Sequence, residues 1–253
     1  MQLMKILALF LALSFTNLLS AETLDMQQYM RDTEALAKQG EYEKALERTL
    51  WFHDNALKHQ PSMSGVRLSF ALGDWMDLAE KYPAALKAMQ KVRDEKTDTL
   101  KSGRGNFNLF MDVNALNRTL KEESKTIDLF RLIDEKQPDL AKICWIVAKP
   151  AVIKNKEFDL ADKYLGNLLT EFAVIKERYE MMVSRSDKIK VGRAQLKSMN
   201  ENRLVEETLL LIETAKALNE VDTAKEIQKR ALGLLDDRRL RKALPSSIGD
   251  ESF

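Results

Sequence analysis

A short pattern recurs along this chain: an aromatic or apolar residue stands three positions before an alanine, directly after a polar, turn-forming segment. The four copies are KQGEYEKAL (38–46, with Tyr42 and Ala45), AEKYPAAL (79–86, with Tyr82 and Ala85), KNKEFDLA (154–161, with Phe158 and Ala161) and LNEVDTA (218–224, with Val221 and Ala224). A fifth, degenerate copy, LKEESKTI, has Glu123 and Thr126 in the two positions. Neighbouring copies lie about 35–40 residues apart, except before the last, and such spacing predicts stacked copies of one structural unit.

The composition indicates that this unit is helical. Good helix formers are abundant, the 253 residues include only 9 Gly and 5 Pro, and runs of β-branched residues are short. A hydrophobic fraction of 45% is enough for a continuous core. We therefore expect an all-α protein rather than a parallel-sheet enzyme fold.

The repeated segments resemble the tetratricopeptide repeat, a helix-turn-helix unit with an aromatic at the start of its second helix and a small residue three positions later. The small residue lets two antiparallel helices approach closely. Further matches are Leu72-Gly73, Trp145, Pro61, Pro138, Ala56 and Ala231. The resemblance implies a right-handed superhelical solenoid of about five antiparallel helix pairs over residues 22–240. It also implies that a protein or peptide partner binds to the concave face.

Three segments depart from the repeat. The second helix of the first repeat is expected to be about one turn longer than in the family, and KSGRGN (101–106) is expected to be a connector. Residues 176–204 fit no repeat and are helical, polar and mildly basic, so we expect them to lengthen a helix pair or to kink the superhelix. Their basic residues form either a solvated helix face or a binding surface. The tail, 241–253, is expected to be flexible.

The N-terminus has the features of a signal peptide. Lys5 precedes an apolar segment at 6–15, and small residues before Glu22 suit cleavage after Ala21. The apolar segment is too short for a bilayer-spanning helix, although an uncleaved anchor is the alternative. We expect residues 1–21 to be removed, which leaves a periplasmic or secreted chain without a transmembrane segment. Its single cysteine, Cys144, cannot form an internal disulfide and is expected to be a buried thiol.

Charge and motifs argue against several functional classes. The 40 Lys and Arg residues are interleaved with 39 Asp and Glu residues, so no overall attraction for nucleic acid is expected. His53 and His59 are six residues apart, which does not place two metal ligands on one helix face. No phosphate-binding, nucleophile or paired-cysteine motif occurs. We expect no catalytic, cofactor-binding or metal-binding residues, and hence not an enzyme.

The family's concave positions supply candidate partner-binding residues. In the register set by Tyr82 they are Arg67, Phe70, Asp74 and Asp77. In the register set by Pro138 they are Asn108, Met111, Ala115 and Arg118, with Asp112 at the edge. Polar members of this set are suited to hydrogen-bonding a peptide backbone or carboxylate, and Phe70 and Met111 to apolar contact. The Lys and Asn clamp of chaperone-binding family members is not reproduced.

Two clusters in the first two repeats complete the candidate site. In WFHDN, the residues His53, Asp54 and Asn55 form either a hydrogen-bonded junction or part of a binding site. In RLSFALGDW (67–75), the helical spacing predicts a core stripe of Leu68, Ala71, Leu72 and Trp75. Arg67 lies on an adjacent face, and Asp54 or Asn55 of the preceding helix is its candidate partner. Two alternatives to a peptide-binding scaffold remain: an enzyme or small-molecule binder with its site at this junction, and a structural subunit of an envelope complex.

Overall fold

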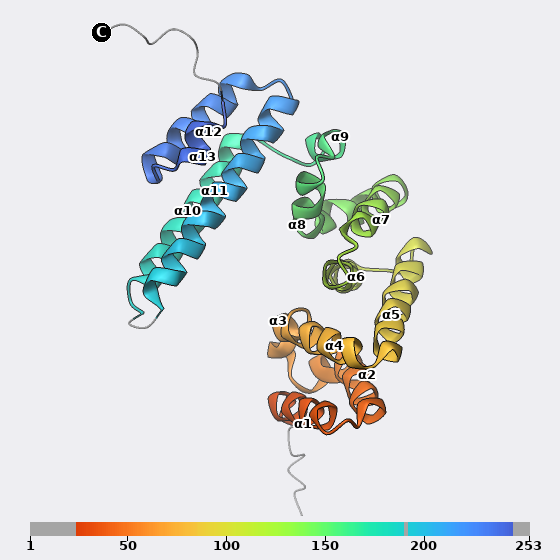
Figure 1. Cartoon of the computed structure of the whole chain (residues 1–253). Coiled ribbons are helices and arrows are strands. Elements are labelled where there is room, and N and C mark those ends of the chain that lie inside the picture. The colour runs from red at the N-terminus through yellow and green to blue at the C-terminus, as the bar shows by residue number, and fades with distance from the viewer. Residues whose placement is uncertain (1–23, 190–191, 245–253) are drawn as a thin grey trace, which may run out of the picture. The chain divides into compact units, whose positions relative to one another are not determined.

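The structure is a computed structural model that describes residues 24–189 and 192–244 (Figure 1). Within these ranges it is all-helical, with thirteen α-helices, one 3-10 turn and no strand. The predicted signal peptide, 1–21, and the tail from residue 245 lie outside the described residues. The chain divides into two compact units, one ending at Ala85 and one beginning at Leu86, so that helix α5 (Pro83–Lys101) carries the boundary.

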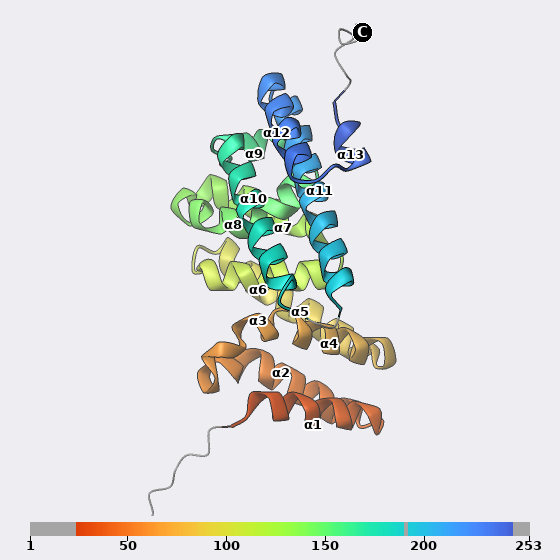
Figure 2. The same cartoon turned by 90° about the vertical axis from the view of Figure 1, so that its left-hand side faces the viewer.

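The first unit contains α1 (Met26–Lys38), α2 (Tyr42–His59), the 3-10 turn η1 (Pro61–Met63), α3 (Ser64–Arg67) and α4 (Phe70–Lys81). Asp25 begins α1, because its carboxylate accepts hydrogen bonds from the backbone N–H groups of Gln27 and Gln28. Helix α2 packs against both α1 and α4 (Figure 2). Phe52 and Trp75 are among the buried side chains of this unit.

The segment RLSFALGDW is not one helix, so the predicted stripe that included Leu68 is wrong. Helix α3 ends at Arg67, and Ser69, with φ −135° and ψ −86°, lies outside both α3 and α4. The Ser69 hydroxyl donates a hydrogen bond of 2.7 Å to the carbonyl of Gly65. Such local side-chain bonds of serine compete with the backbone hydrogen bonds that would continue a helix. Leu72 and Trp75 are buried in α4, whereas Leu68 is only half-buried.

The second unit begins with the rest of α5 and continues through eight further helices: α6 (Phe107–Thr119), α7 (Glu123–Lys136), α8 (Pro138–Lys154), α9 (Phe158–Asp162), α10 (Leu168–Ser186), α11 (Arg193–Ala217), α12 (Val221–Leu234) and α13 (Arg238–Arg241). Neighbours in sequence pack together, notably α6 on α7, α7 on α8, α10 on α11 and α11 on α12. One hydrophobic core surrounds Phe130 and Cys144, and another surrounds Phe172 and Ile227.

One turn geometry recurs between consecutive helices. Gly40, Lys121, Lys156 and Asn219 each have a positive φ, between 59° and 82°, and each is followed by a glutamate. The N–H of that glutamate donates to the carbonyl five residues earlier at 2.8–3.0 Å, which ends one helix and begins the next. Four residues after each glutamate, the small residue of the pattern is buried: Ala45, Thr126, Ala161 and Ala224. The repeated sequence segments therefore form a repeated local structure.

The second copy of the pattern uses a different turn. Tyr82 follows α4 directly, and Pro83 begins α5, where its missing N–H costs nothing. Ala85 is nevertheless buried, and the indole N–H of Trp75 donates to its carbonyl at 3.0 Å. Close packing at the small residue is thus retained with a shorter connection.

The helix that begins in the copy at 154–161 is short, since α9 ends at Asp162. Two residues on, the Tyr164 side chain packs against Phe130 and Trp145 and donates its hydroxyl to Asp134. Asn167 then begins α10 by accepting a hydrogen bond from the N–H of Thr170 at 3.1 Å. The segment after α9 is therefore held by side-chain contacts and not by further helical turns.

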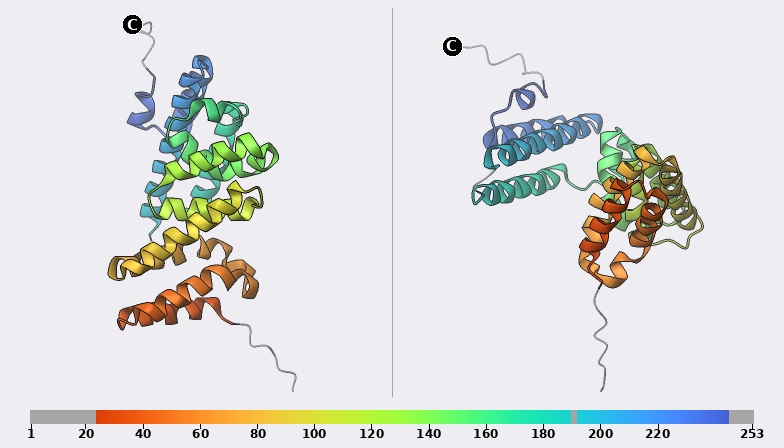
Figure 3. Two further views of the ribbon diagram at one scale, coloured as in Figure 1. Left: turned by 90° about the vertical axis from the view of Figure 1, so that its right-hand side faces the viewer. Right: turned by 60° about the horizontal axis from the view of Figure 1, so that its bottom comes forward.

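Residues 176–204 supply the distal halves of α10 and α11, which lie side by side (Figure 3). Arg178 pairs with Glu207, and Asn200 donates to the Ser186 hydroxyl at 3.0 Å.

After α13, Leu244 is buried against the core around Phe172. In the part of the chain that the structure describes, no helix combines the length and the apolar character needed to cross a membrane.

Candidate functional site

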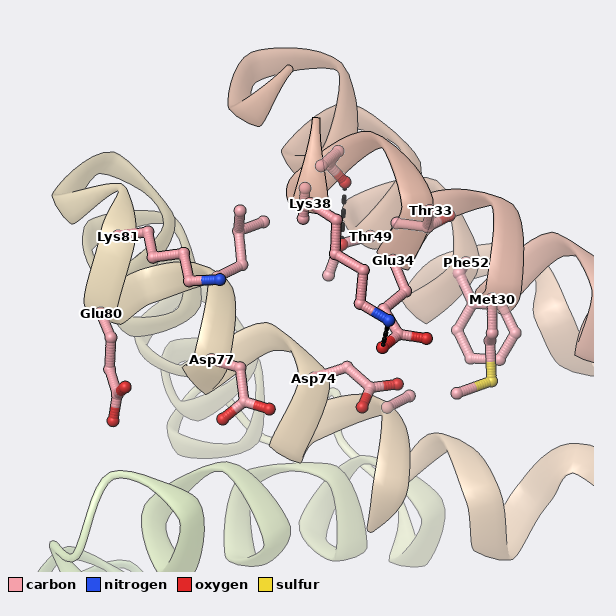
Figure 4. A pocket seen from close by; sticks show the side chains of 14 residues that line it. Met30, Thr33, Glu34, Lys38, Thr49, Phe52, Asp74, Asp77, Glu80 and Lys81 are labelled. Carbon is pink, nitrogen blue, oxygen red and sulfur yellow. Dashed lines mark hydrogen bonds and ion pairs between the residues drawn. The ribbon is translucent and has the colours of Figure 1, made fainter. Parts of the chain in front are cut away.

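A cavity of about 310 Å³ lies within the first unit and is lined by residues of α1, α2 and α4 (Figure 4). Its walls follow one face of each helix, because the lining residues on α1 are spaced as i, i+3, i+4, i+7 and i+8: Met30, Thr33, Glu34, Ala37 and Lys38. On α4 they run from Ala71 to Lys81. With a rise of 1.5 Å per residue, these faces extend for about 12–15 Å. We call this feature the α1/α4 groove.

The floor of the groove is apolar. Phe52 and Leu78 are each only 4% exposed, and Ala45 is fully buried. Met30 and Ala71 are half-buried beside them. A ligand with an aliphatic side chain would therefore remove apolar surface from water on both sides of the contact.

The rim of the groove is mainly acidic. Glu34 faces Asp74 across the groove, and Asp77 follows Asp74 one turn along α4 (Figure 4). Glu34 is paired with Lys38 at 2.6 Å, but among the described residues Asp74 and Asp77 have no ion-pair partner. With Glu80 and Lys81 included, four carboxylates and two ammonium groups line the groove, so its side chains carry a formal charge of about −2 at neutral pH.

The surroundings of Asp74 in the groove favour its neutral form. Partial desolvation raises the pKa of its carboxyl above the usual value, and the nearby carboxylates of Glu34 and Asp77 raise it further. Asp74 remains exposed at the rim, so its carboxyl is accessible to a ligand. The arrangement therefore favours a positive charge at this position.

The WFHDN and RLSFALGDW clusters meet at a buried contact outside the groove. The Arg67 guanidinium donates to the carbonyl of His53 at 3.2 Å and lies 3.5 Å from His53 Nε2. His53 packs edge-on against Trp75, with ring centroids 5.7 Å apart. His53 and Arg67 are both buried, and neither lines the α1/α4 groove. We predicted Asp54 or Asn55 as the partner of Arg67, but the observed contact is with His53.

The other candidates of the first unit are dispersed. Asp54 is exposed on α2, while the Asn55 amide donates to the Trp51 carbonyl at 2.8 Å and accepts from Lys58. Phe70, at the start of α4, is 73% exposed and does not line the groove. Of the predicted partner-binding residues, Asp74 and Asp77 line the groove.

The candidates on α6, in the second unit, differ in their burial. Asp112 is buried and pairs with Lys96 of α5 at 2.6 Å. Asn108 and Arg118 are exposed, and Met111 is half-buried. A position predicted at the edge of a binding surface is therefore part of the contact between α5 and α6.

A second polar cluster joins α5 to α6 and α7, and sequence reasoning did not single it out. The buried Arg93 guanidinium donates to the Asn117 side-chain oxygen at 2.9 Å and also pairs with Glu122. The Asn117 amide in turn donates to the Thr126 hydroxyl at 3.1 Å. In the degenerate copy, Thr126 occupies the position that alanine has in the other copies. Its hydroxyl, which alanine lacks, accepts the hydrogen bond from Asn117. We call these four residues the Arg93 network.

The groove residues on α1 were also missed. Glu34, Thr33 and Lys38 precede the first recognised pattern residue, Tyr42, and no register was assigned to this helix. The signal was the spacing of the apolar Met30 and Ala37 with these polar residues on one helical face. Projecting the register backwards from Tyr42 would have placed that face opposite α4.

Nucleophilic and metal chemistry receive no support from the described side chains. Cys144 is buried, and desolvation raises the pKa of its thiol to about 11, which suppresses the reactive thiolate. Across residues 24–189 and 192–244, no three His, Cys, Asp or Glu side chains gather closely enough to hold a metal ion.

Comparisons with protein-family models, with curated proteins and with solved structures find no significant match for this chain. Functional inference therefore rests on the groove and on the repeated turns.

Proposed function

We propose that this chain is an exported scaffold similar to the tetratricopeptide-repeat proteins, and that its α1/α4 groove binds a protein or peptide partner. The groove is the observation that carries the proposal. It is elongated, open to solvent on its acidic rim and apolar on its floor, which suits an extended segment of chain.

The recurring turn supports the scaffold part of the proposal. Four helix-to-helix connections share a positive-φ residue, a following glutamate and a buried small residue. In a stack of such units, neighbouring first helices line a common surface. Helices α1 and α4 are the first helices of the first two repeats, so the groove lies where the proposed architecture exposes its binding face.

The proposed site has a binding role and not a catalytic one. We interpret the N-terminal segment as a cleaved signal peptide, and we therefore propose that the chain acts in the periplasm or in the extracellular space. A partner in that compartment is consequently expected.

A photo-reactive amino acid tests the proposal. It replaces Lys81, an exposed groove residue, or Lys44, an exposed residue of the same unit outside the groove. Irradiation in the native cell is expected to produce a discrete protein adduct at position 81 and none at position 44. Absence of an adduct at 81, or equal adducts at both positions, would contradict the proposal. An adduct with the mass of a small molecule would favour the small-molecule alternative.

A further inference from the structure

The charge distribution of the α1/α4 groove specifies the chemistry of its partner more closely than the proposed function does. The whole sequence has a formal charge of +1, whereas the groove lining carries four carboxylates against two ammonium groups. One of those ammonium groups, on Lys38, is already paired with Glu34. The negative charge is therefore local to the groove and does not follow from the composition of the chain.

Two carboxylates without an ion-pair partner among the described residues lie beside the apolar floor. Asp74 and Asp77 are three residues apart on one face of α4, and Leu78 and Phe52 line the same groove. A cationic side chain over Asp74 and Asp77 would leave its neighbour in the peptide directed at the floor, because successive side chains of an extended segment alternate in direction. The wall length of about 12–15 Å accommodates about four extended residues.

Resting on the proposed function, we propose that the α1/α4 groove binds a short extended segment in which lysine or arginine residues alternate with aliphatic ones. The cations pair with Asp74 and Asp77, and the aliphatic side chains contact Phe52 and Leu78. An acidic segment, or a free C-terminal carboxylate, is repelled by the same rim. The mutual repulsion of Glu34, Asp74 and Asp77 is relieved when a cation enters.

Fluorescence anisotropy with labelled hexapeptides tests this inference on the full chain. The probe alternates lysine and leucine, one control replaces each lysine by glutamate, and another replaces each leucine by serine. We expect the lysine–leucine peptide to bind, each control to bind at least about tenfold more weakly, and affinity to fall as salt is added.

Paired substitutions locate the binding. The double variant Asp74→Asn/Asp77→Asn is expected to lose about tenfold in affinity for the lysine–leucine peptide. Asp159→Asn/Asp162→Asn is the matched control, because these two aspartates are also exposed, three residues apart and on one helix, α9. Circular dichroism checks that both variants retain their helices.

The outcomes separate this inference from the proposed function. Equal binding of the glutamate–leucine peptide, or unchanged affinity of the Asp74→Asn/Asp77→Asn variant, overturns the cationic specificity even if photo-cross-linking at position 81 succeeds. Failure of all three peptides alongside a protein adduct at position 81 also rejects the specificity but retains the groove as a binding site. Failure of both experiments rejects both statements.

Discussion

The Arg93 guanidinium is buried and paired with the half-buried Glu122, whereas Asp74 and Asp77 in the α1/α4 groove are exposed and lack ion-pair partners among the described residues. The Arg93 side chain is 4% exposed and donates to Asn117 of α6 and to Glu122, which directly precedes α7. Asp74 and Asp77 lie together on α4, in a groove with an apolar floor.

This difference shows how similar residue types serve different purposes. A buried charge must be paired, because an isolated one costs several kcal/mol, so the Arg93 network fixes the arrangement of α5, α6 and α7. The exposed carboxylates of Asp74 and Asp77 fix no such arrangement of helices, and partial desolvation and their mutual repulsion raise the pKa of Asp74.

The largest effect is expected from Arg93→Met. This change keeps most of the side-chain volume but removes the partner of Asn117 and Glu122, and we expect it to lower the free energy of unfolding by about 3 kcal/mol. Urea denaturation followed by circular dichroism measures this loss. The control is Arg31→Met, since Arg31 is exposed and lies 4.0 Å from Asp25; its expected effect is below about 0.5 kcal/mol. Equal losses in the two variants would refute the distinction.

A smaller effect is expected from the pair of Lys96 and Asp112. Lys96→Met leaves the buried Asp112 carboxylate without its 2.6 Å contact, and we expect a loss of about 2 kcal/mol. In the double variant Lys96→Met/Asp112→Asn the losses of the two single variants are expected not to add, with a coupling free energy of about 1 kcal/mol. Chemical denaturation of the four proteins in the cycle gives this coupling free energy. Additive losses would mean that Lys96 does not stabilise Asp112.

The sequence predicted the helices and their turns better than it predicted their ends. The aromatic and alanine pattern located the connections at Gly40, Lys156 and Asn219, because close packing demands a small residue after each turn. It did not predict the break at Ser69 or the early end of α9. These depend on a local hydroxyl bond and on Tyr164 packing with distant aromatic residues, respectively.

The candidate site was harder to predict for a related reason. Helical spacing shows which residues share a face, and it placed Asp74 and Asp77 together on α4. It does not show whether a charge finds a partner on another helix. Arg67 contacts His53, fourteen residues away, and Asp112 pairs with Lys96, sixteen residues away. Only the structure therefore shows which charged side chains pair with another helix and which, like Asp74 and Asp77, have no such pair among the described residues.

The smallest expected effect concerns the stability contribution of Asp74. Burial and two neighbouring carboxylates raise its pKa in the folded chain, so the folded state binds a proton more readily than the unfolded state does. At neutral pH the ionised carboxylate therefore destabilises the folded state. Asp74→Asn removes this cost, and we expect a gain below about 0.5 kcal/mol at pH 7, because the group is exposed and screened.

The pH dependence of that gain sharpens the comparison with the Arg93 network. As pH falls from about 7 to about 3, below the unfolded-state pKa of about 3.9, wild-type Asp74 becomes protonated first in the folded state, and its destabilising effect disappears. The stability advantage of Asp74→Asn should therefore shrink towards zero over this range in urea titrations of both proteins. An advantage that grows on acidification would show that Asp74 has a stabilising partner when ionised. The groove would then resemble the Arg93 network, and the case for a cationic ligand would lose its electrostatic basis.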